Sequence, residues 1–150
     1  MSLKDRITQD MKEAMKAKDK VRLESVRAIK SAIMLAETEK GAAAGMSEGD
    51  EIKLLQKLQK QRKDSIAMYK EQGREDLASE EAAQLTVIEG YLPEPLSEEE
   101  LAAMVDEAIA KTGASGMGDM GKVMGIVNAR AAGRAEGKVV ADLVKAKLNS

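Results

Sequence analysis

Hydrophobic residues recur three or four positions apart along nearly the whole chain of 150 residues. This spacing is typical of amphipathic helices, and the alternation of apolar and polar residues that indicates strands is absent. One apolar stripe follows Ser2 and begins at Leu3, and a second follows Asp19 and continues toward Gly41. Serine and aspartate are preferred residues at helix N-termini. The pattern therefore predicts an all-α chain that begins with two helices.

Two further helices are predicted before residue 91. A long third helix covers residues 51–72, and a fourth is capped by Ser79 and closed by Gly90. The connection over residues 41–49 is rich in small residues and glycine, which indicates a flexible segment. The middle of the third helix, residues 59–64, is polar on every face. Such a stretch either projects into solvent or packs polar groups against a neighbour.

Both prolines of the chain lie in the segment Tyr91-Leu92-Pro93-Glu94-Pro95. Proline restricts its own backbone and that of the residue before it, so we expect an extended, stiff linker here. Three more helices are predicted beyond it, over about residues 97–113, 119–131 and 136–148. We therefore expect a four-helix N-terminal domain, residues 1–92, and a small three-helix C-terminal domain, residues 93–150.

The composition removes most familiar kinds of active site. The chain has no histidine, cysteine, tryptophan or phenylalanine, and its aromatic residues are Tyr69 and Tyr91. It therefore lacks zinc thiolates, nucleophilic cysteines and the histidine that most often acts as a general base. We expect no catalytic residue, no metal site and no cofactor. Recognition of RNA by stacking bases on aromatic side chains is excluded for the same reason.

The chain also lacks the apolar segments that direct proteins to membranes. No apolar run approaches the length of a membrane span, and the first residues contain no signal-peptide core. We therefore expect a cytoplasmic protein without a membrane partner.

The charge is nearly balanced over the whole chain but not along it. The 24 basic and 26 acidic residues give a net charge of −2. Residues 91–110 contain six acidic residues and no basic one, whereas residues 111–150 contain seven basic and three acidic residues, an excess of four positive charges. This C-terminal stretch is the part of the chain with an electrostatic preference for an anionic partner.

Glycine is concentrated in the same stretch, because seven of the 12 glycines lie within residues 113–138. Gly121 and Gly125 lie four apart in a predicted helix, as do Gly133 and Gly137 if the last helix starts early. Glycine inside a helix costs about 1 kcal/mol of helix stability relative to alanine, so we expect a favourable contact at these positions that offsets the cost. Close packing of short helices is the explanation that the sequence favours. The alternative, compatible with it, is approach of phosphate to backbone N–H groups at helix N-termini.

The four cations closest to these glycines are candidates for contacts with phosphate. They are Lys122, Arg130, Arg134 and Lys138. The sequence contains no GxxxxGK[ST] loop, and no strand is predicted before the glycine-rich stretch, so it carries no nucleotide-binding signature.

Several segments, taken together, resemble the GatB/YqeY family, and the whole chain resembles its free-standing YqeY-like members. The segments are Tyr91-Leu92-Pro93, residues 118–125, residues 133–140 with Val144 and Leu148, and upstream residues 60–66 and 73–78. Glu136 stands where the family has Asp, and Gln84 stands where a Glu is common.

The resemblance implies that the C-terminal domain is similar to the tail of GatB, which helps hold tRNA in the tRNA-dependent amidotransferase that makes Gln-tRNA and Asn-tRNA. A similar module is appended to some glutaminyl-tRNA synthetases. Our first hypothesis is therefore a tRNA-binding accessory protein without intrinsic catalysis. In it, Lys122, Arg130, Arg134 and Lys138 contact phosphates, and Gly121, Gly125, Gly133 and Gly137 permit backbone approach.

Two alternatives remain open. The family is associated with carbon–nitrogen ligase activity that uses glutamine as amido-nitrogen donor. This chain has no glutaminase nucleophile arrangement and no ATP loop, so such activity would require partner subunits. The third hypothesis is a protein–protein adaptor with no nucleic-acid role. The partners expected from the resemblance are tRNA and aminoacyl-tRNA synthetase or amidotransferase subunits.

Overall fold

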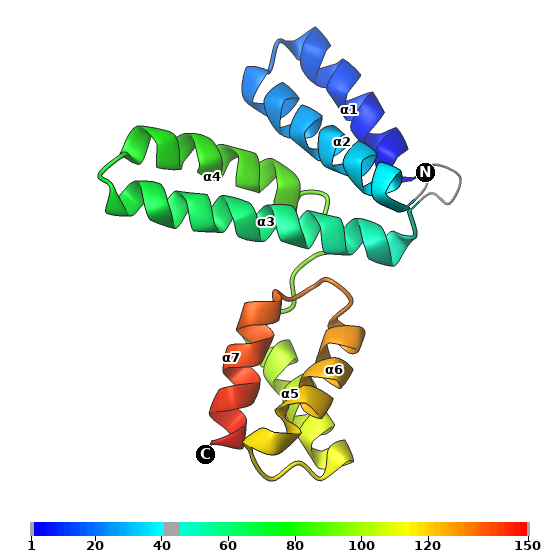
Figure 1. Cartoon of the computed structure of the whole chain (residues 1–150), viewed down its shortest axis with the longest axis vertical. Helices are drawn as coiled ribbons and strands as arrows, with labels where there is room; N and C mark the ends of the chain where they lie inside the picture. The colour runs from blue at the N-terminus through cyan, green and yellow to red at the C-terminus, as the bar shows by residue number, and fades with distance from the viewer. Residues whose placement is uncertain (1, 41–45, 150) are drawn as a thin grey trace. The chain divides into compact units, whose positions relative to one another are not determined.

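The computed structural model describes residues 2–40 and 46–149, which form seven α-helices, one short 3-10 helix and no strand (Figure 1). The all-α class predicted from the sequence is confirmed. The elements are α1 Leu3–Ala17, α2 Lys20–Lys40, α3 Glu48–Glu71, α4 Glu75–Glu89, α5 Glu98–Thr112, η1 Met117–Asp119, α6 Met120–Ala131 and α7 Gly137–Leu148.

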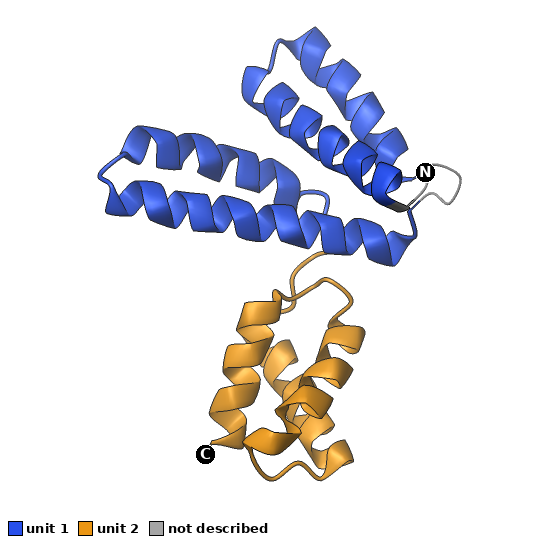
Figure 2. Ribbon diagram, in the orientation of Figure 1, with its two compact units in different colours: residues 1–92 blue, residues 93–150 orange. Residues whose placement is uncertain are grey.

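The chain separates into two compact units, residues 1–92 (unit 1) and residues 93–150 (unit 2), coloured separately in Figure 2. Unit 1 contains α1 to α4, and unit 2 contains α5 to α7 with η1. Each unit has its own apolar core. The buried residues are Leu3, Ile7, Val26, Ile29, Ile33, Leu55 and Ile88 in unit 1, and Leu101, Val105, Ala108, Val123, Val127, Val140 and Val144 in unit 2. That each unit folds as an independent domain stays a prediction.

Serine capping boxes start three of the helices. Ser2, Ser47 and Ser97 each accept a hydrogen bond from the backbone N–H three residues later, and an acidic side chain at that position accepts one in return. These reciprocal bonds satisfy backbone groups that a helix end leaves without partners. The start of α3 at Glu48 corrects the prediction that residues 41–49 form one flexible connection; residues 41–45 lie outside the described residues.

The predicted start of the fourth helix at Ser79 is wrong, because α4 already begins at Glu75. Gly73 ends the preceding helix in the left-handed region, with φ +71°, and Arg74 is the N-cap without a side-chain hydrogen bond to the helix. Acidic residues in the first turn, among them Asp76, favour the positive end of the helix dipole. The true start was missed because it has no serine or threonine cap.

One side of the polar middle of α3 packs against α4, whereas Lys60 and Asp64 face solvent. Gln59 is buried and its Nε2 donates to Oε2 of Glu89 at 3.0 Å. Nη1 of Arg62 lies 3.4 Å from Oε2 of Glu81, and both side chains are largely covered. Nε of Arg62 and Oε2 of Glu81 nevertheless make no hydrogen bond. Of the two alternatives for this stretch, polar packing against a neighbour holds for Gln59 and Arg62, and projection into solvent holds for Lys60 and Asp64.

Candidate nucleic-acid interface

The candidate residues lie on α6, on α7 and on the loop that joins them. Val123, Val127 and Ala131 form the buried face of α6 within unit 2. Residues 132–136 connect α6 to α7, so the last turn of α6 and the first turn of α7 lie at the same end of the unit (Figure 1).

Both α6 and α7 have an exposed Gly-Lys pair in the first turn, Gly121-Lys122 directly after Met120 in α6 and Gly137-Lys138 at the start of α7. Neither helix has an acidic residue in its first turn, and neither has a side-chain hydrogen bond from its N-cap. Cations are unfavourable at the positive end of a helix dipole, whereas anions are stabilised there. Within the described part of the chain, Lys122 and Lys138 form no ion pair. The first turns of these two helices therefore carry positive charge that no acidic residue of the same turn offsets.

The glycines of these helices face open space. A Cβ atom added to Gly121, Gly125 or Gly137 would meet no atom within 4 Å. Close packing between helices, the explanation that the sequence favoured, is therefore wrong at these three positions. Gly125 lies inside α6, where it weakens the helix without a compensating contact in the described residues.

Gly133 has a different role from the other three glycines. It adopts φ +86° directly after Ala132, the C-cap of α6, which itself has φ +46°. Glycine adopts this region without strain, so the turn that ends α6 explains Gly133 without a ligand.

Arg134 holds the loop against the start of unit 2. Its Nε donates to the carbonyl of Glu94 at 2.8 Å, and its own carbonyl accepts from the N–H of Leu96 at 2.8 Å. Sequence reasoning missed this structural role, because the partners lie about 40 residues upstream. Arg134 also contributes to lowering the pKa of Glu100, which is depressed chiefly by hydrogen bonds from Ser97.

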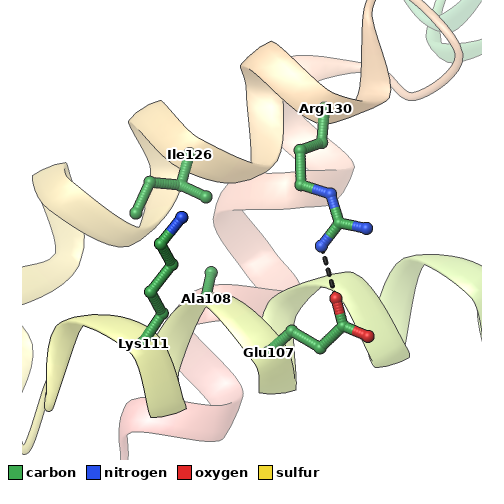
Figure 3. Close-up of a pocket in the computed structure, with 5 residues that line it drawn as sticks. All are labelled: Glu107, Ala108, Lys111, Ile126 and Arg130. Carbon is green, nitrogen blue, oxygen red and sulfur yellow. Dashed lines mark hydrogen bonds and ion pairs between the residues drawn. The ribbon is translucent and has the colours of Figure 1, made fainter.

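Arg130 lies in the last turn of α6 and forms an ion pair with Glu107 of α5 (Figure 3). The two side chains border a shallow pocket of about 260 Å³. Lys111 also lines this pocket, although sequence reasoning did not single it out.

The structure does not gather the four candidate cations into one cluster. Lys122 and Arg130 are eight residues apart on one helix, which at 1.5 Å per residue is roughly 12 Å along the axis. Arg130, Arg134 and Lys138 lie toward the end that carries the connecting loop, and Lys122 lies toward the other end. Lys122 and Arg130 therefore cannot share one phosphate.

Two carboxylates stand next to the open helix starts. Asp119 precedes α6 and accepts a hydrogen bond from the N–H of Ser115 at 3.2 Å, and Glu136 precedes α7. Both reduce the positive potential at these helix ends.

The described ranges 2–40 and 46–149 contain no group of three or more Asp or Glu side chains placed to hold a metal ion. Among the helices in those ranges, none is long and apolar enough to cross a membrane.

Comparison with known proteins gives matches over most of the chain. A protein of Pyrenophora tritici-repentis (strain Pt-1C-BFP), "Altered inheritance of mitochondria protein 41, mitochondrial", is 35% identical over 132 residues, which cover 87% of this chain and 71% of that protein. Its namesake from Kluyveromyces lactis is 36% identical over 85 residues, 57% of this chain and 45% of that protein. This chain thus spans less than half of the second relative. Because both relatives carry mitochondrial names, the expected cytoplasmic location stays a prediction.

A shorter match lies in the C-terminal region. A subunit of the glutamyl-tRNA(Gln) amidotransferase of Thermococcus gammatolerans is 44% identical over 57 residues, which cover 35% of this chain and 9% of that protein. The family described as "Yqey-like protein" matches residues 4–148. Because this match covers nearly the whole chain, the protein belongs to the YqeY-like family.

Proposed function

We propose that this protein is a tRNA-binding accessory protein whose C-terminal unit contacts the phosphate backbone of tRNA. The observation that carries the proposal is the pair of open helix starts, Gly121-Lys122 and Gly137-Lys138. The first backbone N–H groups of a helix have no partner within that helix, and they point toward an anion bound at its end. At α6 the N–H of Met120 already donates to the carbonyl of Met117 in η1, so α7 has the more open of the two starts. At both starts a lysine adds positive charge, and the missing Cβ leaves space for the anion to approach.

The proposal predicts recognition of shape and backbone rather than of bases. Tyr69 and Tyr91 are the aromatic residues of the chain, and both belong to unit 1. Unit 2 therefore has no aromatic side chain on which a base could stack. Binding through phosphates releases counterions, so affinity should fall steeply as salt is raised.

The match to the Thermococcus amidotransferase supports tRNA as the nucleic acid, because the name of that protein refers to a tRNA. The match covers 9% of that protein, so the proposal does not extend its amidotransferase activity to this chain. Under this proposal, the YqeY-like protein presents tRNA to a separate catalyst, such as an amidotransferase or an aminoacyl-tRNA synthetase.

Two lysines of the same helix provide a matched test. Lys138 lies in the first turn of α7 and Lys145 in its last turn, and both are exposed. In titrations of the full chain with total tRNA, Lys138→Ala should weaken binding several-fold and reduce the salt dependence by about one unit of slope. Lys145→Ala removes the same charge away from the helix start and should have a smaller effect.

Equal effects of Lys138→Ala and Lys145→Ala would mean that only the overall charge matters, and the assigned site would be wrong. Capture of a protein partner that withstands nuclease and salt, without measurable tRNA binding, would favour the adaptor instead. Ammonia release from glutamine by the purified chain would show intrinsic catalysis and overturn the accessory role.

A further inference from the structure

The pocket between α5 and α6 combines an apolar floor with charged walls (Figure 3). Ala108 and Ile126 line its floor, and Glu107, Lys111 and Arg130 contribute its charged groups. Its volume of about 260 Å³ lies below the range of roughly 300–1,000 Å³ that is typical of sites enclosing a whole small ligand. The pocket therefore suits a single charged group of a larger partner.

Glu107 is positioned to pair with either cation. Glu107 and Lys111 are four residues apart on α5, and glutamate preceding lysine by four is a favourable arrangement for an ion pair on a helix. The Glu107 carboxylate is instead paired with Arg130 across the pocket. In Figure 3 the Lys111 ammonium group points toward Ile126, into the space between the helices.

The pocket thus contains two cations and one carboxylate. Lys111 forms no ion pair with any residue that the structure describes, so one positive charge faces the pocket without compensation. The side chains of Arg130 and Glu107 are 50% and 64% exposed, and ion pairs this exposed contribute little to stability. Exchange of the Glu107 carboxylate for an external anion would therefore have little effect on the fold.

We propose that this pocket is a phosphate subsite for the RNA backbone, with Glu107 as an internal competitor for Arg130. When a phosphodiester enters, Glu107 leaves Arg130, and Lys111 and Arg130 hold the phosphate from two sides. The planar guanidinium group binds carboxylate and phosphate by the same paired hydrogen bonds, which permits the exchange. This subsite rests on the proposed function, because tRNA is the source of the phosphate.

A neighbouring acidic residue supplies the control for the first test. Asp106 is adjacent to Glu107 on α5, but its carboxylate lies 2.8 Å from Nζ of Lys147 on α7, and Asp106 does not line the pocket. Glu107→Gln and Asp106→Asn each remove one negative charge from the same turn. The two variants therefore separate an effect of the pocket from an effect of net charge.

Binding of tRNA to the full chain is measured for both variants at several salt concentrations. Glu107→Gln should raise affinity by about threefold or more at low salt and steepen the salt dependence, and Asp106→Asn should raise affinity less. Adding Lys111→Ala to Glu107→Gln should remove the gain. Equal gains from Glu107→Gln and Asp106→Asn, or no gain from either, would overturn the subsite while leaving tRNA binding by the wild type intact.

A second measurement keeps the subsite testable if tRNA does not bind. Inorganic phosphate is titrated into the full-length Glu107→Gln variant while the side-chain Nε–Hε resonance of Arg130 is followed by NMR. Saturable shifts that Lys111→Ala abolishes would support the subsite, even if the proposed function failed. An unmoved Arg130 resonance would reject the subsite, even if tRNA binding were observed.

Discussion

The hydroxyl group of Tyr91 donates a hydrogen bond to the carboxylate of Asp10, which joins residues 81 positions apart in the sequence. The guanidinium of Arg6 lies over the Tyr91 ring, 5.1 Å from its centroid, and Nη2 of Arg22 lies 3.5 Å from the Asp10 carboxylate. Burial, followed by the bond to Asp10, raises the pKa of Tyr91 well above its usual value. Tyr91, two residues before Pro93, is thus fixed against the first helix of unit 1.

Tyr91→Phe should lower the free energy of unfolding of unit 1 by about 1–2 kcal/mol, because the partly covered Asp10 carboxylate loses the hydroxyl donor and keeps only its ion pair with Arg22. Urea unfolding of the full chain, followed by circular dichroism, measures the change. Asp10→Asn and the double variant complete a mutant cycle, which isolates the energy of the pair. A Tyr91→Phe variant as stable as the wild type would show that the bond adds nothing to stability.

The capping box of α5 should make unit 2 sensitive to acid. Hydrogen bonds from Ser97 lower the pKa of Glu100, so the folded state binds a proton at this group less readily than the unfolded state. The stabilisation is present above the unfolded pKa of about 4.5 and is lost as pH falls through the lower folded pKa. Glu100→Gln should therefore melt earlier than the wild type at pH 7, and the difference should shrink at pH 3. A difference that is constant with pH would contradict this role.

Gly125→Ala separates stability from binding. Because the added Cβ meets no atom within 4 Å, the substitution should raise the free energy of unfolding by about 0.5–1 kcal/mol. If Gly125 is retained for close approach of RNA, the same variant should bind tRNA more weakly. Thermal unfolding and tRNA titration of the full chain test both effects.

The control for this substitution is Gly49→Ala, which adds a methyl group to an exposed glycine of α3 in unit 1. It should leave tRNA affinity unchanged. If Gly125→Ala stabilises the protein without weakening binding, approach of RNA to that face of α6 is ruled out.

The expected domain division predicts that residues 93–150 fold alone. Unit 2 has its own apolar core, which includes Val105, Val127 and Val144. The isolated fragment should show helical circular dichroism and one cooperative thermal transition. A fragment without a cooperative transition would show that this core depends on the rest of the chain.

Local signals predicted the helices well where a cap and an apolar stripe agreed. Ser2 and Ser97 were recognised as helix starts because each precedes a stripe and has an acid three residues later. Ser47 has the same signature but follows a glycine-rich stretch, which favoured a loop. Ser79 was mistaken for a cap because a serine inside a helix has the same local sequence signal.

The side-chain contacts of the candidate residues in unit 2 could not be predicted from the sequence, because they join residues that are far apart in the chain. Neither the bond from Arg134 to Glu94 nor the pairing of Arg130 with Glu107 has a periodic signature in the sequence. The concentration of glycine was evident in the sequence. Only the packed structure shows that Gly125 faces open space rather than a neighbouring helix. The repeated Gly-Lys-Val tripeptide at residues 121–123 and 137–139 was the local signal that could have marked both open helix starts.

The salt dependence of tRNA binding by the wild-type chain tests the proposed function most directly. We expect measurable binding of total tRNA at about 50 mM salt and a loss of at least tenfold in affinity at about 200 mM, because each neutralised phosphate adds roughly one unit to the slope. Absence of binding at the lower salt, or an affinity that does not change between the two, would contradict a phosphate-binding C-terminal unit.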